Sequence, residues 1–175
     1  YYDDYVENIW QDEKKKIENY IPQLQIVFEN TQFTDKAEKW LGCQLQSDLF
    51  TVTFVTSVEG GAEAIDISQS QDVFGIERGF EDAFYFIGHE FIIYLLMNVL
   101  TNENAFKTFD TWEATEGLAE YYLKKIMGNI RFKEHRKYVE YYEKCEKKMP
   151  LSPVELYRQA LKDAAVLEQN ERGFA

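Results

Sequence analysis

The chain has 175 residues with 45% hydrophobic and 16% aromatic content, which is enough apolar material for one globular domain. Its formal net charge of −12 argues against nucleic acid or an anionic membrane surface as a partner. The longest apolar stretch, 84–100, is interrupted by His89, Glu90 and Asn98, so we expect no membrane span. No linker or repeat divides the chain, and we expect a single domain over residues 1–175.

Cysteine usage and the start of the chain say little about the compartment. Cys43 and Cys145 form no C-x-x-C pair, and the scarcity of cysteine favours two free thiols over one disulfide. The chain begins at Tyr1 with no Met and no apolar leader. The localisation is therefore left open, and export with a leader that this chain does not contain is one of the alternatives.

The amino-terminal third is expected to be helical. Apolar residues spaced among charges predict an amphipathic helix over 3–20. Pro22 is expected to interrupt it, after which 24–29 forms either a second helix or a loop. A short helix is expected over 36–41.

The middle of the chain predicts β structure. Residues 50–58 are rich in β-branched and aromatic side chains, which is typical of a strand. Glu59-Gly60-Gly61 is a turn signal, and 62–67 would be the returning strand. We therefore expect a β-hairpin over 48–68.

The remaining chain predicts helices only. A nearly continuous apolar run predicts a buried helix over 79–101, and a second helix is expected over 110–128, capped by Asp110 or Thr111 and ended by Gly128. Two C-terminal helices are expected within 131–170, the last opened by a capping box from Ser152 to Glu155. The expected fold class is α+β.

The buried helix carries the pair His89-Glu90, followed by Phe91-Ile92-Ile93. The pair resembles the start of the H-E-x-x-H helix of zinc peptidases, in which two imidazoles one turn apart bind zinc and the glutamate is the general base. Ile93 stands where the second histidine would be, and a hydrocarbon cannot bind metal. Alternatively, His89 and Glu90 are hydrogen-bonded polar groups of a buried helix or border a cleft.

The next predicted helix carries Glu116-Gly117-Leu118-Ala119, which resembles the E-G-x-A segment of the gluzincin metallopeptidases. The resemblance covers 86–122, and the element order also resembles that family. It implies a zincin-like fold with His89 as a zinc ligand, Glu90 as the general base and Glu116 as the third zinc ligand. It also implies that Gly117 and Ala119 let the two helices approach each other.

The loss of the second histidine puts the chemistry in doubt. A catalytic zinc normally needs three protein ligands and a water, and two ligands would hold zinc weakly or not at all. Tyr94 is a poor substitute ligand at neutral pH. Glu113 and Glu120 lie on the same helical stripe as Glu116, and we expect a solvated acidic face there rather than added ligands. His135, which lies among basic residues, is expected at the surface.

We therefore expect a gluzincin-like domain with a degraded zinc site, acting as a non-catalytic binding or structural module with a peptide or protein in its cleft. One alternative is an active zinc peptidase with a non-standard ligand set. Another is a helical interaction domain whose motif resemblance is accidental. Tyr121 and Tyr122 could donate to an oxyanion near the metal, although adjacent aromatics on a helix are usually core.

Overall fold

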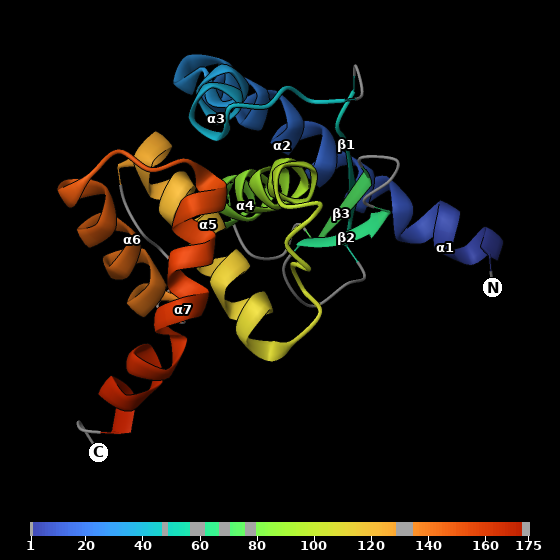
Figure 1. The fold of residues 1–175 in the computed structure, drawn as a ribbon. Coiled ribbons are helices and arrows are strands. Elements are labelled where there is room, and N and C mark those ends of the chain that lie inside the picture. The colour runs from blue at the N-terminus through green and yellow to red at the C-terminus, as the bar shows by residue number, and fades with distance from the viewer. Residues whose placement is uncertain are drawn as a thin grey trace. The chain divides into compact units, whose positions relative to one another are not determined.

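The computed structural model describes residues 2–46, 49–56, 62–66, 71–75, 80–128 and 135–172 (Figure 1). The chain divides into two compact units, each built from two segments. Unit 1 comprises Tyr1–Thr34 and Ser47–Glu90, and unit 2 comprises Asp35–Gln46 and Phe91–Ala175. The single domain expected over 1–175 stays a prediction.

The amino-terminal helices of unit 1 are α1 (Tyr2–Asn8) and α2 (Trp10–Thr31). The expected break at Pro22 is wrong, because α2 continues through this proline for its full length. Pro22 is exposed, so water can hydrogen-bond the carbonyl that the missing proline N–H leaves unpaired. The short helix expected at 36–41 is present as part of α3 (Phe33–Leu41).

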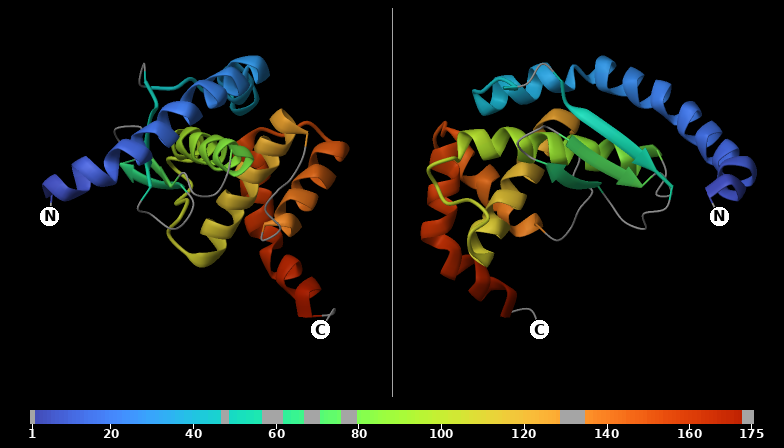
Figure 2. Two further views of the ribbon diagram at one scale, coloured as in Figure 1. Left: turned by 180° about the vertical axis from the view of Figure 1, so that it is seen from behind. Right: turned by 90° about the vertical axis from the view of Figure 1, so that its right-hand side faces the viewer.

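Unit 1 contains a mixed sheet in the order β1-β3-β2. Its strands are β1 (Thr51–Val55), β2 (Ala62–Asp66) and β3 (Gln71–Gly75). β1 pairs with β3 in parallel, and β2 pairs with β3 antiparallel (Figure 2). The expected hairpin over 48–68 is therefore wrong: both of its strands exist, but β3 lies between them. The turn expected at 59–61 lies outside the described residues.

Helix α4 (Phe80–Val99) is the predicted buried helix, and its bounds are within two residues of those expected. Its first half belongs to unit 1. There the Phe84 ring packs edge-on against Phe28 of α2 at 4.5 Å between centroids, and the Phe86 ring lies 6.3 Å from Phe74 of β3. These contacts pack the first half of α4 against both α2 and the sheet. None of the helices in the described residues is long and apolar enough to cross a membrane.

Unit 2 contains most of α3, the second half of α4 and three further helices. These are α5 (Phe109–Met127), α6 (Arg136–Lys148) and α7 (Pro153–Arg172), and their bounds lie within a few residues of the predicted ones. Thr108, rather than Asp110 or Thr111, is the N-cap of α5, and Gly128 ends the helix at φ 80° as predicted. The Ser152 capping box is confirmed, since the Glu155 carboxylate accepts a hydrogen bond from the Ser152 backbone N–H at 2.8 Å. The α+β class is thus confirmed.

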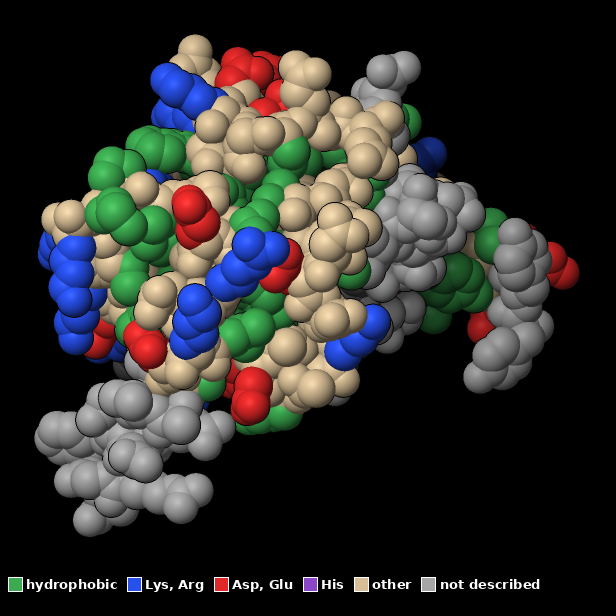
Figure 3. Space-filling view, viewed as in Figure 1, with side chains coloured by type: hydrophobic (Ala, Val, Ile, Leu, Met, Phe, Trp, Pro, Cys, Tyr) green, Lys and Arg blue, Asp and Glu red, His purple; other side chains and the backbone are tan. Residues whose placement is uncertain are grey.

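The surface carries charges of both signs side by side. On the face drawn in Figure 3, Lys and Arg side chains alternate with Asp and Glu side chains over the C-terminal helices. Within unit 2, Nη2 of Arg158 on α7 lies 2.5 Å from Oε1 of Glu103. Such mixed charge offers no basic patch on that face for a polyanion.

Candidate functional site

The predicted zinc-binding residues fall in both units. His89 and Glu90 lie on α4 at the end of the unit 1 segment, with His89 only 7% exposed and Glu90 partly buried. Glu116 lies on α5 in unit 2, also partly buried. Their joint use as zinc ligands and general base stays a prediction.

Unit 1 buries a second carboxyl group that sequence analysis missed. Asp72 is the second residue of β3 and is 1% exposed. It shares a sheet face with Phe74, whose ring contacts Phe86 of α4, so Asp72 lies on the apolar side of the sheet that faces this helix. Neither carboxyl oxygen has a hydrogen-bond partner within ordinary distance in the described part of the chain.

Burial changes the acid–base behaviour of this group. The pKa of Asp72 is raised to about 8, chiefly by loss of hydration and also by the negative charge of Glu90, while the backbone N–H of Val73 lowers it. Asp72 is therefore mostly protonated near neutral pH, where it can donate a proton or a hydrogen bond. A neutral acid beside the predicted general base is the main chemical feature of unit 1.

In unit 2 the acidic stripe of α5 is not the solvated face that the sequence predicted. Glu120 is 1% exposed, and the Glu113 side chain is 13% exposed. The Glu113 carboxylate lies 3.4 Å from Nζ of Lys137 and 3.9 Å from Nδ1 of His135. One of the three glutamates of this stripe is therefore buried, and the other two are partly buried, in unit 2.

His135 is buried rather than at the surface, so that expectation is wrong. It is 8% exposed, and its ring meets the Trp112 ring edge-on at 5.6 Å. Trp112 and Glu113 both come from the start of α5. The basic residues around His135 in sequence gave no sign of these contacts, because helix packing makes them.

The glycine of the E-G-x-A segment serves a close helix approach, but within unit 2 its partner is α6. A Cβ atom on Gly117 would lie 2.3 Å from Cβ of Tyr138 and 2.9 Å from its Cγ. Real Cβ atoms do not come so close, so only glycine fits at this crossing. Within this unit Gly117 is thus explained by the α5–α6 packing alone.

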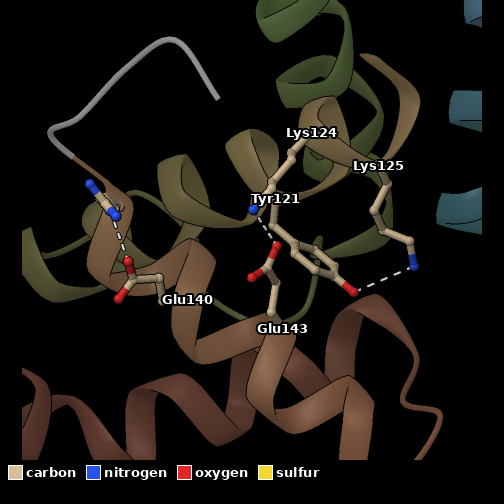
Figure 4. Close-up of polar contacts among 6 residues, drawn as sticks. Tyr121, Lys124, Lys125, Glu140 and Glu143 are labelled. Atoms are coloured by element: carbon tan, nitrogen blue, oxygen red, sulfur yellow. Dashed lines mark hydrogen bonds and ion pairs between the residues drawn. The ribbon is translucent and has the colours of Figure 1, made fainter. Parts of the chain in front are cut away.

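The paired tyrosines of α5 belong to the core. Tyr121 and Tyr122 are 1% and 2% exposed, with their rings 5.0 Å apart. Figure 4 shows Lys125 directed at the Tyr121 hydroxyl, 3.4 Å away, and Lys124 directed at Glu143 of α6. Burial is the largest cause that raises the pKa of both tyrosines, which keeps them neutral.

Lys125 makes more contacts than its neighbour, which predicts a difference between matched variants. Its Nζ lies 2.5 Å from the Glu146 carboxylate and 3.7 Å from the centre of the Trp40 ring. We expect Lys125→Met to lower the free energy of unfolding by about 1–2 kcal/mol and Lys124→Met by less than about 1 kcal/mol. Urea unfolding of both variants measures this, and equal losses would contradict it.

Comparison with known proteins gives no indication of function. No protein family model, no curated protein and no solved structure matches this chain. Among the described residues, no group of three or more His, Cys, Asp or Glu is arranged to hold a metal ion.

Proposed function

We propose that this chain is a gluzincin-like domain with a degraded zinc site, acting as a non-catalytic binding module. The observation that carries the proposal is Ile93, a 5% exposed hydrocarbon one helical turn after His89 on α4. In the peptidase pattern that position supplies the second imidazole. Without it, His89 and Glu116 are two ligands where a catalytic zinc needs three.

Two features of the molecule support the part of this proposal that concerns the fold, a gluzincin-like domain. The strands precede the helix that carries His89-Glu90, and the helix that carries Glu116 follows it, which is the element order of the resemblance. The pair His89-Glu90 also lies in a helix that is buried along most of its length, as a peptidase active-site helix would be. The ligand of the module would be a peptide or protein segment.

Zinc binding by the metal-stripped protein, measured by calorimetry beside Ile93→His, tests the proposal. We expect the unchanged protein to bind zinc weakly or not at all. Ile93→His restores the third ligand and should raise the zinc affinity by at least about a hundredfold. Ile92→His is the matched control, because Ile92 is equally buried but points about 100° away around the helix. It should leave zinc binding unchanged.

The other outcomes separate the alternatives. Tight stoichiometric binding by the unchanged protein would overturn the degraded site in favour of an active peptidase with an unusual ligand set. Binding by neither protein, with both folded by circular dichroism, would favour a helical interaction domain. In the Ile93→His background, Glu116→Gln should remove the gained affinity, because an amide is a much poorer zinc ligand than a carboxylate.

A further inference from the structure

Unit 1 contains a cavity that lies apart from the motif residues. It has a volume of about 350 Å³, within the range of small-molecule sites. Its walls come from α2, from β1 with the residue before it, and from one side chain of α4. The lining residues are Ile21, Leu24, Gln25, Phe28, Glu29, Phe50, Val52, Phe54 and Ile87.

The apolar part of this cavity has fixed walls. Leu24 and Ile87 are 4% and 5% exposed and lie at its inner side. The Phe28 ring is held edge-on by Phe33 and Phe84, at 5.3 Å and 4.5 Å between centroids. A preformed apolar wall needs little reordering when a ligand enters, which favours binding.

The polar residues of the lining are both on α2 and both exposed. Gln25 and Glu29 are one helical turn apart, so they share the side of α2 that borders the cavity. Glu29 is the only charged residue among the lining residues, and none of them is basic. The exposed side of the cavity therefore favours a positive charge.

The aromatic lining favours the same charge. Phe28, Phe50 and Phe54 can present ring faces to a cation, and an ammonium group gains from such contacts when it is partly desolvated. The net charge of −12 also attracts cations to this protein. An anionic head group would meet Glu29 and gain neither contribution.

We propose that this cavity binds a small amphipathic cation, an alkylammonium whose chain lies against Leu24 and Ile87 and whose head group lies beside Glu29. The hydrocarbon would be buried by the apolar wall, and the Gln25 side chain would border the head group at the opening. The cavity is lined by neither His89 nor Glu116. This proposal is therefore independent of the proposed zinc site.

Octyltrimethylammonium, octanol and octanoate are the probes that test the proposal, since they share a chain and differ in head-group charge. Calorimetry on the intact protein should give one site, with the cation bound about tenfold more tightly than octanol and octanoate bound most weakly. Equal affinity for all three would overturn the choice of ligand.

Variants locate the site and its charge. Glu29→Gln should reduce the preference for the cation over octanol about threefold without changing octanol binding. Glu18→Gln, an exposed glutamate of α2 that does not line the cavity, should leave the preference unchanged. A preference that Glu29→Gln leaves at its full size, or that Glu18→Gln reduces equally, would overturn the role of Glu29.

A third variant blocks the cavity. Gln25→Trp changes an exposed residue, so the fold should persist, and the larger side chain would fill the opening. It should abolish binding of both the cation and octanol. Unchanged binding of both ligands to a folded Gln25→Trp variant would place the ligand elsewhere and overturn the proposal.

Discussion

Asp72→Asn should remove most of a large pH dependence from the stability of this protein. Asp72 is 1% exposed, and its pKa rises from 3.8 to about 8 in the folded state. Between those values the folded protein holds a proton that the unfolded chain releases, so stability is lost as pH rises. Asparagine cannot ionise, and this contribution disappears with the substitution.

The pKa shift of Asp72 sets the size of the pH dependence of the free energy of unfolding. A rise from 3.8 to about 8 corresponds to at most about 6 kcal/mol. Relaxation and water entry reduce such costs, so we expect the unchanged protein to lose on the order of 3 kcal/mol between pH 4 and pH 9. Urea unfolding across that range should show Asp72→Asn matching the unchanged protein at pH 4 and exceeding it at pH 9.

Two further variants make this result specific. Glu90→Gln removes a negative charge that raises the pKa of Asp72 in the folded protein. The loss of stability should therefore begin at the same pH, set by the unfolded chain, but end at lower pH and reach a smaller total. Asp12→Asn, on the exposed surface of α2, should leave the pH profile nearly unchanged. A profile for Asp72→Asn that parallels the unchanged protein would show that Asp72 ionises normally in the fold.

The long helices could be predicted from sequence because their signals are local. Residues 79–101 and 110–128 carry continuous helical patterns and a recognisable stop at Gly128, and α4 and α5 match them closely. Pro22 is the exception: a local breaker signal that α2 overrides. Helix formation over many residues outweighs one lost hydrogen bond at an exposed position.

Strand pairing and burial were not predictable in the same way, because both depend on residues distant in sequence. β3 reads Gln-Asp-Val-Phe-Gly, too polar to be recognised as the central strand, and the hairpin prediction omitted it. Because β3 was not recognised as a strand, the burial of Asp72 in it was not predicted either. The basic sequence neighbours of His135 predict a surface position, and the acidic stripe shared with Glu116 predicts a solvated Glu113. Instead, Nδ1 of His135 lies 3.9 Å from the Glu113 carboxylate, because helix packing brings the two together.

Gly117→Ala should destabilise the protein by about 1–3 kcal/mol, although alanine is normally the better helix former. The added Cβ would lie 2.3 Å from Cβ of Tyr138, an atom fixed to the α6 backbone and unable to rotate away. The α5–α6 crossing must then open, which loosens the packing around Tyr142, whose buried hydroxyl donates to the Ala114 carbonyl at 2.8 Å.

Gly128→Ala is the matched control, because it adds the same atom in a different setting. Gly128 has φ 80° and nothing within 4 Å of its added Cβ, so its cost is backbone strain alone, about 1 kcal/mol. Gly117→Ala should also weaken near-ultraviolet circular dichroism from the packed tyrosines, while Gly128→Ala should not. A Gly117→Ala variant as stable as the unchanged protein would mean that α5 and α6 do not meet this closely in solution. The close approach of α5 and α6 would then no longer explain why a glycine occupies position 117.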